Sequence, residues 1–252
     1  MCLITIITVV YNDKQNIART MKSVLNQTYQ DLEYILIDGN SSDGTMDEIN
    51  SVIREFPNRS IRLISEPDKG VYDAMNKGIA NSSGDWLNFM NSGDVFHSSN
   101  VLEEMQFDKE KNPHVIYYAN SMVSHWDGTY LEKPSPFFKT PHKFKGIGIN
   151  HNTMFFPGEI VRNMKHNLDY KICADYDFCM RLYKAGYQFV YRDVIVVDYS
   201  WGNGISSNPL GQIPIRKENA KIAEQTLNTF YWAYLLREYY RLWQRRRLLK
   251  KK

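Results

Sequence analysis

The strongest constraint on the fold is a regular alternation of strand and helix patterns over the first hundred residues. The first strand, Leu3–Val10, is an unbroken apolar run, which is typical of a strand buried on both faces. Each strand is followed by helical spacing, and such units build parallel sheets with right-handed crossovers. The sequence therefore predicts an α/β fold with a mostly parallel central sheet flanked by helices. The expected strands are Leu3–Val10, Glu33–Asp38, Ile61–Ser65 and Trp86–Met90, and the expected helices are Asp13–Asn26, Met46–Phe56 and Val71–Ala80.

The second half of the chain lacks this rhythm. A long loop rich in Pro, Phe, Lys and Gly, Pro134–Gly148, lies between its first two strands, and long loops in compact domains are usually functional or mobile. A later helix is expected to stop at Gly186, because glycine is common in the C′ position. The expected elements are strands at Val115–Tyr118, Thr153–Phe156 and Phe189–Tyr199, a helix at Asp175–Lys184, a loop at Ser200–Pro214 and a helical segment over 216–247.

Net charge separates the C-terminal segment from the rest of the chain. The formal charge is +3 over 252 residues, yet residues 216–252 hold 11 Lys and Arg against 3 Asp and Glu, and the remaining 215 residues hold 20 against 25. We divide the chain into two halves of one domain, 1–112 and 113–214, and a basic, aromatic helical tail, 215–252. Because the basic residues belong to the tail, no nucleic-acid groove is expected in the main body.

Cysteine usage and hydropathy set further limits. Cys2, Cys173 and Cys179 are an odd number without metal-ligand spacing, so neither a disulfide framework nor a zinc site is expected. The N-terminal residues indicate a strand and not a signal peptide, and no run approaches the roughly 18–20 apolar residues of a membrane span. These features predict a cytoplasmic protein.

Polar residues follow the expected strands where open α/β sheets carry their ligands. Asn12 follows the first strand, Asp38 ends the second, and Asn91–Asp94 follows the fourth. The carboxyl ends of parallel strands meet at one edge of the sheet, and ligands bind there. No GxGxxG follows the first strand, which argues against a dinucleotide-binding dehydrogenase.

With these segments the chain resembles the family 2 glycosyltransferases, inverting enzymes of the GT-A fold. The resemblance implies sugar transfer from a nucleoside-diphosphate sugar, with a UDP-sugar favoured, to a hydroxyl acceptor on a bacterial surface polysaccharide or lipid-linked glycan. The Gln-x-x-Arg-Trp signature of processive members is absent, which favours single transfers. The matching segments, in the family's order over residues 2–205, are Thr8–Asn12, Asp38–Thr45, Gly70–Asn76, Asn91–Asp94 and Ala174–Asp177.

The resemblance places the nucleotide in the first half of the domain. Asp38 is expected to accept an N–H of the base, and Gly39 after it admits a ligand closely. The alternative is an Asx-turn that caps the next helix, which suits Asp43 better. The other expected contacts with the nucleotide-sugar are Thr8, Val10 and Tyr11 as a pocket wall, Lys69 beside a helix start that offers N–H groups to an anion, Asn76, Asn91 and Gly93; core packing is the alternative for Thr8 and a solvated side chain for Lys69.

Asn91–Asp94 occupies the position of the family's metal-binding DxD motif. Only Asp94 in it is a carboxylate, so Asp94 is the expected protein ligand for Mn²⁺ or Mg²⁺, and metal affinity without nucleotide should be weak. The alternative is a turn with Asp94 as a helix N-cap. His151, which begins the strand-like run His151–Phe156, is a second candidate ligand, with a buried polar core residue as its alternative.

Asp175 is the expected catalytic base. Positions 175, 178, 179 and 182 share one face of a helix, and the last three are apolar, so Asp175 points inward while Asp177 lies about 200° away. The helix dipole keeps an inward carboxylate in the first turn ionised, as deprotonation of a sugar hydroxyl requires. By resemblance, Asp175 is the inverting base, although Ala174 stands where the family often has Glu.

The tail combines aromatic residues with clustered cations, at Arg245–Arg247 and Lys250–Lys252. This combination predicts contact with an anionic membrane, at the inner face of the cell membrane. The alternative is a helix packed on the catalytic domain or on a second copy in an oligomer. For the whole chain, the alternative to an enzyme is a non-catalytic module that binds nucleotide-sugars or partners in a glycan-assembly complex.

Overall fold

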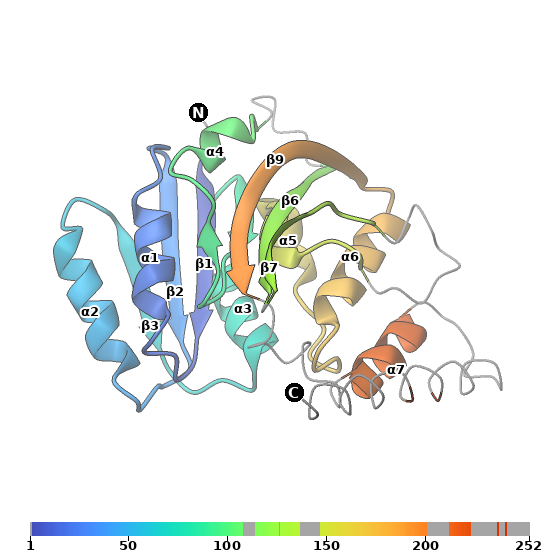
Figure 1. The fold of residues 1–252 in the computed structure, drawn as a ribbon, viewed down its shortest axis with the longest axis horizontal. Helices are drawn as coiled ribbons and strands as arrows, with labels where there is room; N and C mark the ends of the chain where they lie inside the picture. Colours follow the sequence, from blue (N-terminus) through green and yellow to red (C-terminus); the bar gives the residue numbers. More distant parts are fainter. Residues whose placement is uncertain are drawn as a thin grey trace.

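A mixed nine-stranded sheet lies at the centre of the molecule, with helices on both of its faces (Figure 1). The computed structural model describes residues 2–107, 114–125, 127–136, 147–200 and 212–222, together with residues 236 and 240. The strand order is β3-β2-β1-β4-β8-β6-β9-β5, and β7 pairs with β6 outside this path. The elements of the first half are β1 (Ile4–Val10), α1 (Ile17–Leu25), β2 (Leu32–Asp38), α2 (Thr45–Glu55), β3 (Ile61–Ser65), α3 (Val71–Ala80), β4 (Trp86–Phe89), β5 (Val95–Phe96) and α4 (Val101–Glu104). Those of the second half are β6 (Val115–His125), β7 (Gly128–Glu132), the 3₁₀ turn η2 (His151–Thr153), β8 (Met154–Pro157), α5 (Gly158–Met164), α6 (Ala174–Lys184), β9 (Gln188–Ser200) and α7 (Gln212–Ile222).

The first half of the sheet has the predicted parallel arrangement. β3, β2, β1 and β4 are parallel neighbours, and the register aligns Val10 with Asp38 and Asp38 with Ser65. The strands therefore end together, and the polar residues that follow them lie at one edge. All seven residues of β1 are buried, because helices cover both faces of this strand.

The second half of the sheet is mixed and not mostly parallel. β8 runs antiparallel to both β4 and β6, and β5 runs antiparallel to β9, whereas β6 and β9 are parallel. The expected mostly parallel sheet is therefore correct for the first half only. The reversal at β8 places the residues of η2, just before it, next to the end of β4.

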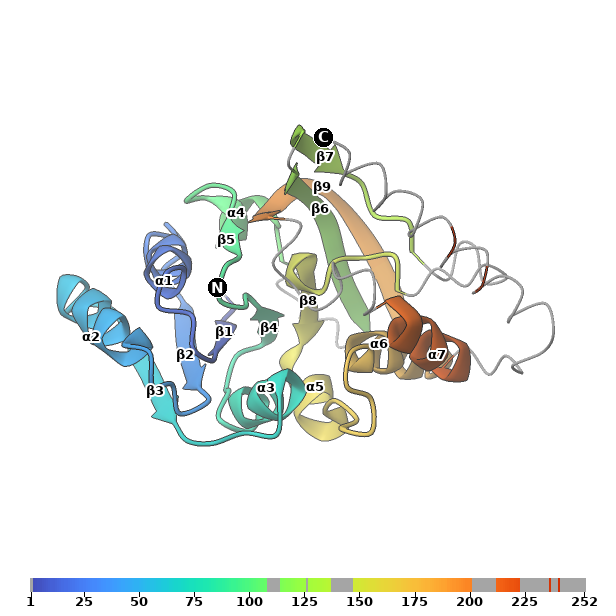
Figure 2. The same cartoon turned by 60° about the horizontal axis from the view of Figure 1, so that its bottom comes forward.

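Two apolar layers hold the helices against the sheet (Figure 2). Residues of α1, α2 and α4 pack on one face, and residues of α3, α5, α6 and α7 pack on the other.

Local differences from the predicted elements have simple causes. The helix α3 has the predicted bounds, and α6 ends in the predicted way: Gly186, at φ +88°, follows the last turn, and the N–H of Tyr187 donates to the carbonyl of Leu182 over 3.1 Å. β6 extends to His125 instead of Tyr118, paired with β7, a strand whose five residues are all exposed and show no alternation. His151 lies in a 3₁₀ turn and not in a strand.

The C-terminal segment begins as a packed helix. α7 starts at Gln212, before the expected position 216, and its Ile222 is buried in the apolar layer of α3 and α6. Packing on the domain, the alternative considered for the tail, thus holds for residues 212–222. Residues 137–146 and 201–211 of the expected loops, and the tail after 222 apart from two positions, lie outside the described residues. In the part that is described, no helix has both the length and the apolar character to cross a membrane.

Candidate active site

The turn after β4 is anchored to the start of α1. Gly93 has φ +100°, a conformation that favours glycine, and its N–H donates to the hydroxyl of Thr20 over 3.0 Å. Arg19 donates to the carbonyl of Gly93 over 3.2 Å, and Ser92 donates to the carboxylate of Asp13 over 2.6 Å. These bonds fix the backbone of the turn that contains Asn91 and Asp94. For Gly93, the structure therefore shows a conformational role, and its contact with the nucleotide-sugar stays a prediction.

Asp94 meets the η2 turn across the edge of the sheet. The side-chain amide of Asn152 donates to Asp94 Oδ2 over 3.1 Å, and Asn91 Nδ2 lies 3.0 Å from His151 Nε2. Burial raises the pKa of the Asp94 carboxyl, and His151, the bond from Asn152 and Arg19 oppose the rise. The acid, two amides and an imidazole thus form one polar cluster.

Asp175 approaches the same cluster from α6. Its side chain lies in the first turn and is only partly exposed, while Phe178, Cys179 and Leu182 behind it are buried, so the predicted helix face is correct. The N–H of Tyr176 donates to Asp175 Oδ1 over 2.8 Å, and the phenol oxygen of Tyr72 lies 3.3 Å from the same atom. Burial raises the pKa of Asp175, and the nearby His151 lowers it.

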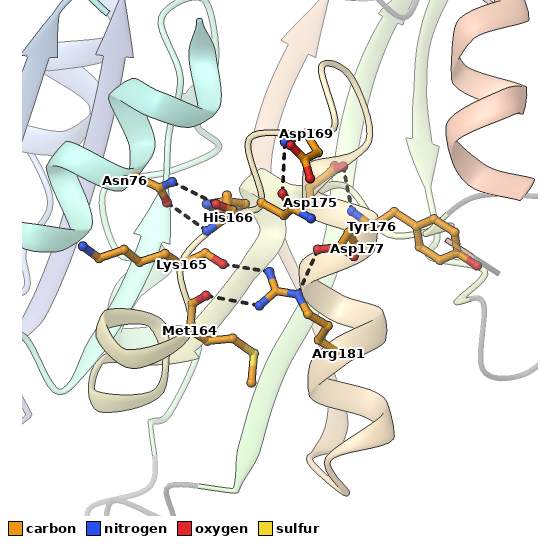
Figure 3. Close-up of polar contacts among 10 residues, drawn as sticks. Asn76, Met164, Lys165, His166, Asp169, Asp175, Tyr176, Asp177 and Arg181 are labelled. Carbon is orange, nitrogen blue, oxygen red and sulfur yellow. Dashed lines mark hydrogen bonds and ion pairs between the residues drawn. The ribbon is translucent and has the colours of Figure 1, made fainter. Parts of the chain in front are cut away.

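His151 links the two acids. His151 lowers the pKa of both Asp94 and Asp175, so these three side chains, predicted separately from three segments, lie near one another. Asp177 does not join them: it accepts a bond of 2.8 Å from Arg181, which also donates to the carbonyls of Met164 and Lys165 (Figure 3). Asp177 therefore braces α6 against the end of α5.

Of the expected nucleotide contacts, Tyr11 has an exposed aromatic ring. Its side chain is 65% exposed at the end of β1, and a Cβ added to Gly39 would lie 3.2 Å from its ring and 2.5 Å from Asp68 Oδ2. Gly39 thus lets the end of β2 approach the ring of Tyr11 and the carboxylate of Asp68. An exposed ring beside this backbone is suited to stacking on a base.

The side chain of Asp38, at the end of β2, is fully buried. Its carboxylate accepts the hydroxyl of Ser65 over 2.6 Å and the N–H of Ser41 over 3.1 Å. The expected contact with the base stays a prediction, and these bonds give Asp38 a loop-fixing role as well. Asp43 accepts the N–H of Thr45 over 3.0 Å at the start of α2, which is the Asx-turn expected for it.

Four other expected contacts have side chains or backbone groups engaged within the protein. Asn76 bonds the backbone of His166 twice, over 2.9 and 2.8 Å, and so ties α3 to the loop before α6 (Figure 3). Thr8 is buried and accepts the phenol of Tyr34, as its core alternative required, and Val10 is buried in the layer under α1. Beside exposed Lys69, two N–H groups just before α3 are engaged: that of Lys69 donates to Asp73 and that of Gly70 to Asp68.

Two residues of the site, Asn152 and Tyr72, were not predicted from the sequence. Asn152 touches Asp94, and Tyr72 touches Asp175, although both lie in segments that were singled out. A signal was present in Asn88, an amide in the middle of the apolar strand β4, because it donates to the carbonyls of Asn152 and Met154 over 2.8 and 2.9 Å and fixes η2 beside β4. A polar residue in an apolar strand indicates such a neighbour.

The residues around Asp94 fit a divalent cation only in part. The Oδ1 atoms of Asn91 and Asn152 are buried without a hydrogen-bond partner, and with the Asp94 carboxylate they make an oxygen-rich set suited to Mg²⁺ or Mn²⁺. Among the described residues, no three His, Cys, Asp or Glu side chains gather to hold a metal. A single carboxylate therefore fits a cation that takes further ligands from a diphosphate.

Comparison of the sequence with known families and proteins gives one consistent result. Residues 5–184 match the family model of Glycosyl transferase family 2. A PGL/p-HBAD biosynthesis glycosyltransferase of Mycobacterium bovis is 30% identical over 196 residues, 74% of this chain and 72% of that protein. An uncharacterized glycosyltransferase of Mycobacterium tuberculosis is 32% identical over 181 residues, 71% of this chain and 68% of that protein.

Solved structures share the fold at low identity. S. aureus TarS 1–349 in complex with UDP-GlcNAc has a TM-score of 0.65 at 14% identity, over 87% of this chain and 70% of that one. The mannosyltransferase PcManGT from Pyrobaculum calidifontis, in complex with GDP-Man and Mn²⁺, has a TM-score of 0.67 at 16% identity, over 96% of this chain and 70% of that one. These neighbours confirm the predicted GT-A fold.

Proposed function

The chain belongs to glycosyl transferase family 2, and from this premise we propose that it moves a sugar from a nucleoside-diphosphate sugar to a hydroxyl acceptor with inversion at the anomeric carbon. The polar cluster of Asp94, Asn152, Asn91 and His151, with Asp175 near His151, carries the proposal. Three segments more than twenty residues apart bring two acids and an imidazole to the edge of the sheet where α/β proteins bind ligands. UDP-GlcNAc and GDP-Man, bound by the structural neighbours, are the donor chemistry that this edge would hold.

In the proposed reaction, Asp175 is the general base. Its carboxylate takes the proton of the acceptor hydroxyl, the acceptor oxygen bonds to the anomeric carbon, and the nucleoside diphosphate leaves from the opposite face. The raised pKa of Asp175 makes its carboxylate a stronger base than that of an ordinary aspartate. The N–H of Tyr176 fixes the direction of its carboxylate, and the phenol oxygen of Tyr72 lies 3.3 Å from the same oxygen.

Asp94 is the proposed protein ligand of a divalent cation, with Asn91, Asn152 and His151 around it. When bound, Mn²⁺ or Mg²⁺ would neutralise the charge of the departing diphosphate. On the nucleoside side, the exposed ring of Tyr11 would stack on the base, and Asp38 would accept an N–H of the base if Ser41 or Ser65 gave up its bond.

A thermal-shift screen tests the donor class. We expect one of the UDP-, GDP- or dTDP-sugars, with UDP-sugars favoured, to raise the melting temperature in the presence of Mn²⁺. A ligand at about 100 times its Kd adds roughly 2.7 kcal/mol to the free energy of unfolding. Release of nucleoside diphosphate on addition of a hydroxyl acceptor, with inverted product by NMR, tests the transfer. No response to any donor would contradict the proposal.

The metal is tested at Asp94. In Asp94→Asn, the amide keeps an oxygen for Asn152 but loses the charge, so we expect a weaker effect of Mn²⁺ on nucleoside-diphosphate affinity and a lower turnover. Titration calorimetry with and without Mn²⁺ measures the first and product formation the second. Full activity in EDTA, or an unchanged metal response in the variant, would show that Asp94 has another role.

One observation favours a second candidate function. The cluster around Asp94 has a single carboxylate, which suits a module that binds nucleotide-sugars within a glycan-assembly complex without catalysis. Such a module would respond to donors in the thermal screen, yet it would release no nucleoside diphosphate with any acceptor. The acids at both Asp94 and Asp175 favour the enzyme.

The setting is proposed from the family and the tail. A bacterial surface polysaccharide or a lipid-linked glycan would supply the acceptor, and the enzyme would act in the cytoplasm at the inner face of the cell membrane. Radiolabelled transfer to a total lipid extract, compared with transfer to a water-soluble glycan fraction, distinguishes the two acceptor classes.

A further inference from the structure

Glu218, in α7, binds three consecutive backbone N–H groups of another segment. Its Oε1 accepts the N–H of Lys171 over 3.0 Å, and its Oε2 accepts those of Ile172 and Cys173 over 3.1 and 2.9 Å. Bonds from N–H groups to a carboxylate are stronger than bonds between neutral groups, and three on one side chain fix the segment in position and in direction. This segment, residues 171–173, leads directly into α6.

The segment 171–173 leads into the first turn of α6, which contains the candidate base Asp175. Cys173 is the N-cap residue of α6 and makes no capping bond with its side chain, and Asp175 follows two residues later. The first turn of α6 can shift only if residues 171–173 shift with it. The bonds to Glu218 therefore restrain the position of Asp175 relative to the polar cluster at Asp94 and His151.

A second contact holds the same segment from the opposite side. The phenol of Tyr72, in α3, donates to the carbonyl of Ile172 over 2.5 Å and lies near Asp175. The peptide unit before α6 is thus held between α3 and α7. Since one hydroxyl proton serves one strong bond, Tyr72 alone does not fix both Ile172 and Asp175, and the N–H groups depend on Glu218.

Packing keeps Glu218 in place. Ile222 of α7 is buried in the layer that contains α6, Ile215 packs against the same layer, and α7 lies beside α6 in both views (Figures 1 and 2). Lys221 Nζ lies 5.1 Å from the centre of the Tyr170 ring, just before the segment. The helix is a fixed part of the domain on this side.

We propose that Glu218 is a positioning residue for sugar transfer, which sets the place of Asp175 through the backbone of residues 171–173. The inference rests on the proposed function of Asp175. It assigns a role in the reaction to α7, which lies beyond the residues 5–184 that match the family.

The test uses the full chain with Glu218→Ala and Glu218→Gln. A displacement of about 1 Å in a catalytic group can lower the rate about 100-fold, so we expect kcat of Glu218→Ala to fall by roughly 10- to 100-fold. The affinity for the nucleoside diphosphate should change less than about twofold, because the bonds of Glu218 go to residues 171–173 and not to the expected nucleotide contacts among the described residues. Glu218→Gln keeps an acceptor for the N–H groups of Ile172 and Cys173 and loses the one for Lys171, so its kcat should lie between wild type and Glu218→Ala.

Two controls separate positioning from general stability. Glu159→Ala removes an exposed carboxylate from the first turn of α5 and should leave kcat unchanged. Hydrogen exchange, which does not depend on activity, should show faster exchange of the amides of residues 171–173 in Glu218→Ala, with the protection of β1 unchanged.

The outcomes are distinct. A Glu218→Ala variant with a lower melting temperature but a wild-type kcat below that temperature would overturn the positioning role, and so would unchanged exchange at residues 171–173. If Asp175→Asn also keeps full kcat, the proposed role of Asp175 fails, and the role of Glu218 fails with it. If only Asp175→Asn loses activity, the base stands and the inference about Glu218 is wrong.

Discussion

At the scale of single residues, the two acids of the site share one physical situation. Asp94 and Asp175 are both withdrawn from water, and burial raises the pKa of each against the effect of His151. A carboxylate in such a place is costly for the fold, and groups of this kind cluster at functional sites. Asp177, two residues from Asp175, differs because its carboxylate is paired with Arg181 over 2.8 Å.

The first prediction separates the two acids of α6 by activity. Asp175→Asn should lower kcat about 10²–10⁴-fold, the usual contribution of a general base, with nucleoside-diphosphate affinity nearly unchanged. Asp177→Asn should have a much milder effect on the rate in a folded protein. Product formation and titration calorimetry measure the two quantities. If only Asp177→Asn loses turnover, Asp177 is the base and Asp175 is not.

The second prediction separates them by pH and stability. Because the pKa of Asp175 is raised in the folded state, the folded chain holds this proton to higher pH than the unfolded chain. The contribution of Asp175 to stability is therefore greatest at low pH and is lost as the pH rises through the raised pKa. Asp175→Asn, which stays neutral, should melt at a higher temperature than wild type at pH 7.5. Asp177→Asn should melt lower, since it weakens a pair worth about 1 kcal/mol.

Activity should follow the same pKa. Transfer requires the ionised base, so kcat should fall on the acid side with a midpoint above the value of about 4 of an ordinary aspartate. A pH–rate profile at saturating donor measures the midpoint. An acid limb at pH 4 or below, together with a destabilised Asp175→Asn, would contradict the assignment of Asp175 as a buried base.

At the scale of helices and strands, local pattern predicted the long elements of both halves and missed the short ones. In the second half, β8, α6 and β9 lie within one residue of their predicted bounds, whereas β7 and α5 were not predicted. β1 is a run of apolar residues because helices cover both of its faces, and α3 has the bounds that its spacing indicates. β7 has five exposed residues and thus no alternation to detect, and α5 is only seven residues long after Pro157. These elements exist because neighbouring strands and helices stabilise them, which a local pattern does not record.

The third prediction concerns how α3 is joined to the loop before α6. Asn76 was expected to contact the nucleotide-sugar, and the structure instead shows two bonds to the backbone of His166. Asn76→Ala leaves those backbone groups without partners, so the free energy of unfolding should fall by about 1–3 kcal/mol. Denaturant unfolding measures this change.

Asn76→Asp is the matched control, because it keeps the acceptor for the N–H of His166 and loses the donor. We expect it to be less destabilised than Asn76→Ala. Donor affinity at a temperature well below the melting point should be close to wild type in both. A large loss of donor affinity without a loss of stability would restore the expected contact of Asn76 with the nucleotide-sugar.

At the scale of the whole molecule, the main site residues could be predicted from the sequence, but the hydrogen bonds that hold their segments together could not. Asp94 and Asp175 were predicted from motifs, whereas the bonds of Glu218 join residues 45 to 47 positions apart and those of Tyr72 join residues 100 positions apart. No periodicity relates such residues. The packing of the tail was not predictable either, because it depends on contacts with distant residues. Its first turns pack on the domain through Ile222, and its cationic end lies outside the described residues.

The last prediction concerns that cationic end. Residues 223–252 hold eight Lys and Arg and two Glu, with aromatic residues among them. Each basic residue near an anionic lipid surface contributes about 1 kcal/mol, screened over a Debye length of about 8–10 Å at moderate salt. We therefore expect the full chain to sediment with anionic liposomes at low salt and to be released at high salt, whereas a chain ending at Ile222 stays in solution.

Ending the chain at Ile222 is essential to this test, because the shorter chain keeps α7 and the bonds of Glu218 and should stay folded and active. A second variant, with Arg245, Arg246 and Arg247 replaced by Gln in the full chain, removes charge without removing the aromatic residues. It should bind anionic liposomes more weakly than wild type and lose much of the salt dependence. If all three chains bind equally, or if none binds at low salt, the tail does not recognise lipid. A melting temperature that falls when residues 223–252 are removed would then show that this segment packs on the protein.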